Sequence, residues 1–404
     1  GEIIRPSRII VSNSANNYFS EYSDDGAAVF ESAKEEAAKL LAPAGTVVTE
    51  ITLEQYEAAC SEFDSVQLYF DCNIPFRAFC ERLCDRAPSS VDLAGSFYIL
   101  AFSDADLKSF FIKSGDGAFR VISDVERSPL SVIESKFTGP ETVMFHASEI
   151  LGGQSSCFIP IMVSMNAERG SAAAHIGNYE DIAESVFGDT FDFVRKITDT
   201  FGNVTYMYSY GAKRLTITAD GTLEFKEDVS GGSSEGFYSD LDKALAFLSS
   251  TDSFAAGSLR LSSAQELQGM QQNRVRGYRF SFVQSAGDLA VHTENPAATI
   301  EVYGGKISYA KICLLNLNTQ AGESYIAYDA ANLIAENSSY LYESLTGESA
   351  ESADAAFRFI ADRLSDLYPG YVVRGDELLP VWLLELGGST FAFDIITGAG
   401  YGLV

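Results

Sequence analysis

The 404-residue chain lacks several features that would assign it to a function class directly. It has no apolar run of 18 or more residues, so no segment is expected to cross a membrane as a helix. It has no H-E-x-x-H or phosphate-loop motif, and the glycines at 387–388 and 398–402 indicate turns because no Lys-Ser/Thr pair follows them. We therefore predict no catalytic, cofactor-binding or metal-binding residue, no cofactor, and a protein that is not an enzyme.

Basic residues are scarce relative to acidic ones. The chain has 28 Lys and Arg against 56 Asp and Glu, a formal net charge of −28. The electrostatic field of a protein with this net negative charge repels phosphate backbones and anionic lipid headgroups. Nucleic-acid binding and direct lipid binding are therefore not expected. A solvated acidic surface accounts for this charge, and a basic partner or bound cations are the functional alternative.

Histidine and tryptophan are also rare. The three histidines, His146, His175 and His292, lie in different segments and make no ligand pair, so each is interpreted as a surface or structural residue. The single tryptophan, Trp382, lies in a strand near Pro380, where packing in the core or on a sheet face is favoured over sugar stacking. These residues therefore carry no prediction of a catalytic site.

Two acidic pairs have the spacing of calcium-binding loops, namely Asp104 with Asp106 and Asp240 with Asp242. Neither continues with the glycine and the distal glutamate that complete an EF-hand loop. No calcium site is predicted at either pair.

Six cysteines are present, with spacing that fits no zinc motif: Cys60, Cys72, Cys80, Cys84, Cys157 and Cys313. Cys80 and Cys84 share one face of an expected helix, where side chains four residues apart are held roughly 5–6 Å from each other, too far for an easy disulfide. We interpret the cysteines as buried free thiols. A bridge involving Cys72 or Cys60 is the alternative.

The clearest secondary-structure pattern runs from residue 275 to 316. Tyr278, Phe280 and Phe282 alternate with Arg279 and Ser281, as in a strand with one apolar and one polar face. Further on, the Gly304-Gly305 dipeptide between two apolar runs predicts a hairpin, because a two-residue turn requires positive φ. This stretch is expected to form three or four antiparallel strands.

The first part of the chain predicts one α+β domain over residues 1–170. Helices are expected at 27–41, 54–62 and 76–84, and strands at 3–11, 47–53, 65–70, 97–102, 109–114, 118–122 and 157–163. Residues 167–178 are rich in small side chains and are interpreted as a linker.

After this linker, helices alternate with sheet-forming segments. Helices are expected at 179–187, 240–249 with Ser239 as N-cap, 325–338 and 352–367, with strands at 205–210, 214–218 and 222–226 and a closing hairpin of 378–386 and 390–396. The predicted class is a multi-domain α+β protein, with antiparallel sheets each packed with helices and weakly repeated helix-then-sheet units in the C-terminal half. Its predicted domains are residues 1–170, a central α+β unit at 171–234, and a C-terminal α+β domain at 235–404.

Several segments, taken in order, resemble the YycH family, the extracytoplasmic regulators of the WalK (YycG) sensor kinase of Gram-positive bacteria. They are residues 47–84 with NIPFRAF, 187–225 with AKRLTITADG, 239–282 ending in YRFSF, and 363–398 with LLPVWLLELGGSTFAFDIITG. The chain departs from the family at Ser285-Ala286-Gly287, where Gly-Pro-Val is usual, and its cysteines are not part of the family pattern.

The resemblance implies a membrane-anchored extracellular module whose cytoplasmic start and transmembrane helix precede Gly1. It implies a C-terminal domain like that of the companion protein YycI, and negative regulation of the kinase in a complex with a YycI-like protein and the WalK-like kinase. It transfers no site residues and leaves open a homodimer. The alternatives are a secreted hydrolase or glycan-binding lipoprotein, and an inhibitor-like module that binds proteases through exposed sheet edges.

Overall fold

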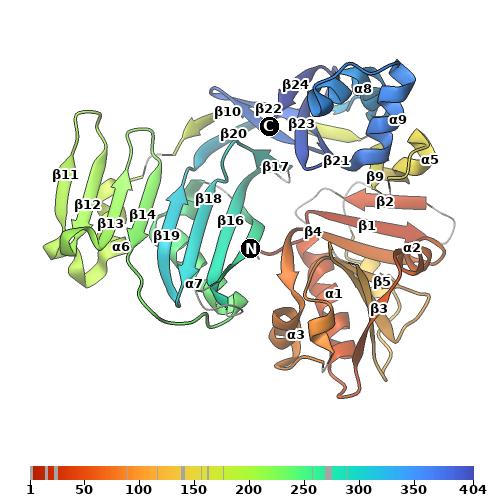
Figure 1. The fold of residues 1–404 in the computed structure, drawn as a ribbon, viewed down its shortest axis with the longest axis horizontal. Coiled ribbons are helices and arrows are strands. Elements are labelled where there is room, and N and C mark those ends of the chain that lie inside the picture. The colour runs from red at the N-terminus through yellow and green to blue at the C-terminus, as the bar shows by residue number, and fades with distance from the viewer. Residues whose placement is uncertain are drawn as a thin grey trace.

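The computed structural model describes residues 3–13, 17–21, 26–88, 90–115, 117–137, 142–155, 157–161, 163–175, 177–256, 258–268, 275–287 and 289–404. It is a multi-domain α+β structure built on two sheets (Figure 1). Among the described strands, every pairing is antiparallel except that of β17 (Leu289–His292) with β21 (Leu364–Arg374). No helix in the described part of the chain is long and apolar enough to cross a bilayer.

The N-terminal part is a nine-stranded sheet. Its order is β3 (Val47–Ile51), β7 (Ala118–Ile122), β6 (Ser109–Lys113), β5 (Ser96–Ser103), β4 (Ser65–Pro75), β1 (Arg8–Asn13), β2 (Asn17–Glu21), β8 (Thr142–His146) and β9 (Phe158–Ile161). The central strands β5 and β6 are apolar almost without interruption, which is the pattern of strands buried on both faces.

Helices cover both faces of this sheet. On one face, α1 (Gly26–Leu41) and α3 (Phe76–Cys84) share a core with Leu100 and Ile112. On the other face, α2 (Leu53–Ser61) packs through Tyr56 and Cys60 against Ala101 and Phe111. Two short helices, α4 (Ser131–Glu134) and α5 (Ala147–Leu151), complete this part.

The second sheet contains the remaining strands. Its main order is β11 (Arg195–Thr198), β12 (Val204–Tyr208), β13 (Lys213–Ile217), β14 (Leu223–Glu227), β19 (Lys306–Ile312), β18 (Ala298–Tyr303), β16 (Val275–Ala286), β17, β21, β22 (Glu377–Leu386), β10 (Ser164–Ala174) and β20 (Leu315–Ile326). Beside it, β15 (Ser258–Gln268) pairs with β16, β23 (Ser389–Asp394) with β22, and β24 (Gly400–Leu403) with β23.

In the half of this sheet from β11 to β16, the helices α6 (Tyr179–Phe187) and α7 (Phe237–Ser250) lie on one face (Figure 1). Phe237 of α7 packs edge-on against Tyr278 and Phe280, and Phe247 packs on Phe225. The alternation of apolar and polar residues in these strands therefore directs one set of side chains into the core and the other away from it.

In the other half, β21, β22 and β23 pack against α8 (Ala330–Thr346) and α9 (Ala353–Arg363). Trp382 is 1% exposed, and its indole N–H donates to the Tyr328 carbonyl at 2.9 Å. The interpretation of Trp382 as a packing residue is confirmed, because a ring this buried offers no face to a sugar.

The predicted linker at residues 167–178 is wrong for most of its length. Residues 164–174 form β10, which pairs with β20 and, at Gly170 and Ser171, with β22. A Cβ at Gly170 would meet the Asn318 carbonyl oxygen at 2.2 Å, so the small residues there allow close approach of neighbouring strands rather than flexibility. The domain boundaries near residues 170 and 234 remain predictions.

Several predicted boundaries also differ from the structure. The helix predicted at 325–338 begins only at Ala330, because β20 extends to Ile326 and Asp329 caps the helix by accepting from the Asn332 N–H. The helix predicted at 352–367 ends at Arg363, where β21 begins. Ser239 is not an N-cap, because α7 already begins at Phe237.

Both predicted hairpins are confirmed. Tyr303 pairs with Lys306 across Gly304-Gly305, whose φ angles are +59° and +78°. Leu386 pairs with Ser389 across Gly387-Gly388. The six cysteines are free thiols, as interpreted, and three of them, Cys60, Cys72 and Cys80, are buried.

Candidate functional site

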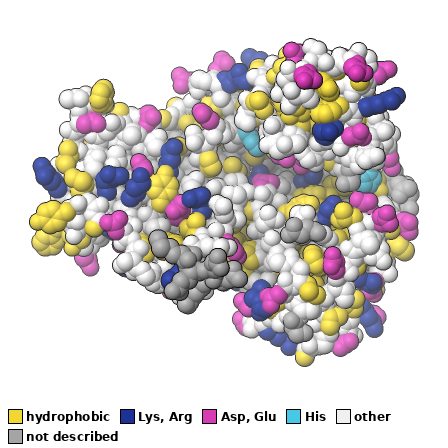
Figure 2. All heavy atoms as spheres, in the orientation of Figure 1, with side chains coloured by type: hydrophobic (Ala, Val, Ile, Leu, Met, Phe, Trp, Pro, Cys, Tyr) yellow, Lys and Arg dark blue, Asp and Glu magenta, His cyan; other side chains and the backbone are white. Residues whose placement is uncertain are grey.

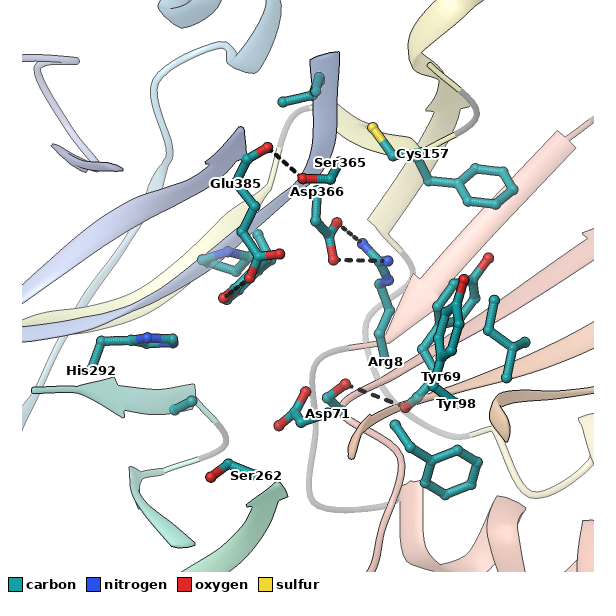
Figure 3. Close-up of a pocket in the computed structure, with 18 of the residues that line it drawn as sticks. Arg8, Tyr69, Asp71, Tyr98, Cys157, Ser262, His292, Ser365, Asp366 and Glu385 are labelled. Carbon is teal, nitrogen blue, oxygen red and sulfur yellow. Dashed lines mark hydrogen bonds and ion pairs between the residues drawn. The ribbon is translucent and has the colours of Figure 1, made fainter. Parts of the chain in front are cut away.

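A cleft of about 750 Å³ lies where the two sheets meet. Its lining comes from β1, β4 and β5 of the first sheet, from β15, β17, β21 and β22 of the second, and from the segment before β9 (Figure 3). Cavities of this size hold small ligands in many proteins. The cleft is therefore the candidate functional site.

An ion pair between Arg8 and Asp366 joins the sheets at this cleft. The guanidinium donates to both carboxylate oxygens, at 2.7 and 3.2 Å, and also lies 4.7 Å from the centre of the Tyr69 ring (Figure 3). The Leu367 N–H donates to the same carboxylate at 2.8 Å. Because the Arg8 side chain is only 8% exposed, this bidentate pair fixes β1 against β21 in a partly dry environment.

A second pair, Asp71 with Arg260, crosses the same junction at 2.8 Å. Asp71 belongs to β4, and Arg260 belongs to β15, whose strand lies beside β4. Arg260 is 7% exposed, and its Nε–H is buried with no hydrogen-bond partner. This arginine therefore retains a donor that the protein itself does not satisfy.

Glu385 is the third carboxylate of the cleft. It accepts a hydrogen bond of 2.9 Å from the Tyr368 hydroxyl, and its backbone carbonyl accepts one from the Ser365 hydroxyl. Burial raises the pKa of Glu385, and the nearby Asp366 charge raises it further. Glu385 is thus biased toward its protonated form, in which it can also donate a proton.

His292 lies on β17 at the edge of the cleft, with its ring 5.9 Å from that of Tyr368. Burial lowers the pKa of His292, so its imidazole is held neutral. The other two histidines lie elsewhere: His146 packs against Tyr18 and Phe158, and the Nδ1 of His175 lies 3.0 Å from the Asn316 side-chain oxygen. The structure does not bring the three histidines together.

The nucleophiles of the cleft are not activated. Burial raises the pKa of Cys157 to about 11, so the group is a thiol near neutral pH. The Ser155 hydroxyl donates to the Leu364 carbonyl at 2.6 Å, which places its proton on a backbone acceptor rather than on a base. The cleft can therefore exchange a proton through Glu385, whereas neither Ser155 nor Cys157 is prepared as a nucleophile.

Three of the four acids in the pairs of calcium-loop spacing bind other side chains. Asp104 binds Arg127 at 3.0 Å and Asp106 binds Arg120 at 2.5 Å, while Asp240 is buried and accepts from the Ser234 hydroxyl. Asp242, the second acid of that pair, does not line the cleft. Within the described residues, no group of three or more His, Cys, Asp or Glu side chains is placed to hold a metal.

Sequence reasoning missed the cleft entirely. Its charged members come from positions 8, 71, 113, 260, 366 and 385, which are isolated residues in strand segments. The one local signal is a charge inside an otherwise apolar strand, as with Asp71 after SVQLYF and Glu385 after VWLL, because a buried charge needs a partner.

No family model and no curated protein sequence matches the chain. Among solved structures, it is similar to YycH from Bacillus subtilis, with a TM-score of 0.61, 14% identity and coverage of 97% of both chains. An uncharacterized protein from Eubacterium rectale ATCC 33656 is 11% identical over 61% of this chain and 90% of its own, with a TM-score of 0.38, too low to support an argument. The chain therefore has a fold similar to that of YycH along nearly its whole length.

Proposed function

We propose that the chain is the extracellular regulatory part of a membrane-anchored protein that lowers the activity of a two-component sensor histidine kinase through protein contacts. The observation that carries this proposal is the similarity to the YycH fold across 97% of both chains. The sequence segments that resemble the family lie in the same order along the chain, which adds independent support. The proposed partners are a YycI-like protein and a WalK-like kinase.

The cleft is compatible with this role. The ion pair of Arg8 with Asp366 and that of Asp71 with Arg260 fix the two sheets relative to each other. A regulator that acts through contacts needs surfaces held in a fixed arrangement, and buried charge pairs provide geometric specificity at such junctions. In this role the cleft is a structural joint rather than a reaction site.

The test is genetic and uses the full-length gene in its own host. Deleting the gene should raise the output of the kinase, measured with a reporter gene driven by the cognate response regulator, and re-expression should restore it. A secreted version without any membrane anchor is the matched control, and we expect it to restore regulation poorly. Unchanged output on deletion would contradict the proposal.

One observation favours a second function, a hydrolase acting in the cleft. Glu385 has a raised pKa, as a general acid requires, and two further carboxylates lie in the same cleft. These two carboxylates already have cationic partners. Asp71 pairs with Arg260, and both carboxylate oxygens of Asp366 accept hydrogen bonds from Arg8. Glu385→Gln separates the two functions, because a hydrolase would lose activity on soluble cell-wall glycan fragments, whereas a contact regulator would keep its effect on the kinase reporter.

A further inference from the structure

Within the described residues, one face of the sheet from β11 to β16 is covered by no helix (Figure 1). On its covered face, the paired strands direct buried side chains toward α6 and α7, among them Tyr206, Leu215, Phe225, Ile300 and Phe280. On the opposite face, none of the outward residues of β11, β12, β13, β14, β19 and β18 is buried. This half of the sheet is therefore packed on one side only.

The open face has the opposite charge balance to the rest of the chain. Register places five cations on it, away from the hairpin turns, and we call this surface the basic face: Arg195, Arg214, Lys226, Arg279 and Lys311. Only two acids lie among them, Glu224 and Glu301. The whole chain carries twice as many acidic as basic residues, so this surface is a local reversal of sign (Figure 2).

Part of this positive charge is not neutralised within the protein. Glu224 pairs with Lys226 at 2.5 Å and Glu301 pairs with Arg279 at 2.6 Å. Arg195, Arg214 and Lys311 have no ion pair among the described residues. Three cations therefore remain available on one open face, and a surface of this kind attracts an acidic partner.

The edge beside the basic face bears exposed aromatic side chains. Phe193 precedes β11, Phe201 lies in the turn after it, and Tyr210 lies in the turn after β12, with exposures of 76%, 81% and 110%. All four residues of β11 are exposed, and in the described chain β11 pairs only with β12. Aromatic residues and arginine are the types enriched in protein interfaces, so the combination favours a protein over a mineral or lipid surface.

The backbone holds Tyr210 outward in a costly conformation. Ser209 and Tyr210 have φ angles of +48° and +59°, a region that side chains other than glycine rarely adopt. Strain of this kind, at a fully exposed side chain, is typical of functional positions.

We infer that the basic face and the β11 edge together form a docking surface for an acidic segment of a protein partner. This inference deepens the proposed function, on which it rests, by naming the surface and the charge of what binds there. An acidic segment lying across the strands would place carboxylates against Arg195, Arg214 and Lys311, and its apolar side chains against Phe193 and Tyr210 at the end of β11 that bears Arg195.

The test uses the purified chain and fluorescently labelled poly-L-glutamate as the acidic polypeptide, with anisotropy measured at low and at high salt. Wild type should bind at low salt and release at high salt. The triple variant Arg195→Glu/Arg214→Glu/Lys311→Glu should bind at least about tenfold more weakly, because three attractive contacts become repulsive. All three sites are on the open face, so circular dichroism should report an unchanged fold.

The matched control reverses three exposed cations elsewhere, as Lys108→Glu/Lys136→Glu/Arg358→Glu. It changes the net charge equally, and we expect its binding to fall by less than about twofold at moderate salt, where distant charges are screened. Equal weakening in both variants, or no binding by wild type, would overturn the inference. Phe193→Ser/Tyr210→Ser should weaken binding of an acidic peptide that contains leucine but not that of poly-L-glutamate.

Other occupants are distinguished in the same experiments. Binding of phosphatidylglycerol vesicles that equals poly-L-glutamate binding and is lost in the triple variant would assign the face to anionic lipid. Self-association in sedimentation, lost in that variant, would assign it to a second copy. Either result would overturn the inference, and none of these measurements involves the kinase, so the reporter test of the proposed function stands or fails separately.

Discussion

The N-terminal sheet and the part of the second sheet from β11 to β16 differ in how many of their faces are buried. In the N-terminal sheet, Phe111 and Ile112 are neighbours in β6 and both are buried, one facing α2 and the other facing α1 and α3. In the sheet from β11 to β16, Ile300 is buried but its neighbour Thr299 is half-exposed. Strand β6 of the first sheet is thus covered on both faces, whereas the part of the second sheet from β11 to β16 is packed on one face only.

The largest expected effect on stability is in the N-terminal sheet and tests whether both of its faces are buried. Phe111→Ala should lower the free energy of unfolding by about 3–5 kcal/mol, and Ile112→Ala by about 2–5 kcal/mol, because each leaves a cavity in a packed layer. Urea unfolding followed by tyrosine fluorescence measures both. If either neighbour tolerated alanine with little loss, the sheet would not be covered on both faces.

The second prediction makes a matching pair of alanine substitutions, at two neighbouring residues of β18 in the sheet from β11 to β16. Ile300→Ala should cost about 2–4 kcal/mol through its cavity, whereas Thr299→Ala should stay within about 0.5 kcal/mol, as surface changes usually do. The same urea titration reports the difference. A large loss at Thr299 would mean that this face is covered, which would also remove the basis for a docking surface there.

The third prediction concerns the joint between the sheets. Arg8→Met leaves Asp366 without its cation, and because the Asp366 side chain is 26% exposed, we expect a loss of about 1–3 kcal/mol rather than the full cost of a buried charge. The double variant Arg8→Met/Asp366→Leu should recover part of that loss. Unfolding curves for the two single variants and the double variant form the cycle, and additive losses would show that the pair is not coupled.

The smallest expected effect is a pH dependence in the cleft. Because burial raises the pKa of Glu385, the folded state favours the protonated acid, and its stabilising contribution is lost as pH rises through the folded pKa. Glu385→Gln keeps an acceptor for the Tyr368 hydroxyl but carries no charge. It should be more stable than wild type near neutral pH, with an advantage that vanishes below the unfolded pKa of a glutamate. If the stability advantage of Glu385→Gln over wild type grew as the pH was lowered, the pKa of Glu385 would not be raised in the folded state.

The sequence predicted the elements whose pattern is local. Alternation at Tyr278, Phe280 and Phe282 and the turn at Gly304-Gly305 correctly indicate β16 and the hairpin of β18 and β19. The α+β class and the buried Trp382 are likewise confirmed. These features depend on neighbours within a few residues, and periodicity records them directly.

Features that depend on distant partners were not predictable in this way. Small residues around Gly170 suggest a linker until β20 and β22 are placed beside them. The cleft joins Arg8 to Asp366 and Asp71 to Arg260, and no local pattern relates those positions. The charge reversal of the basic face also appears only when register brings Arg195, Arg214 and Lys311 to one side.

The position of β10 in the second sheet has a consequence for biosynthesis. The nine-stranded sheet is complete at Ile161, so it can form as soon as the first part of the chain is made. Strand β10 follows at once, yet its partners β20 and β22 are made much later, the second of them near the C-terminus. Until then its edges are open to wrong pairing, and a ribosome stall or a late truncation would release a chain with a finished first half and a strand without its partners.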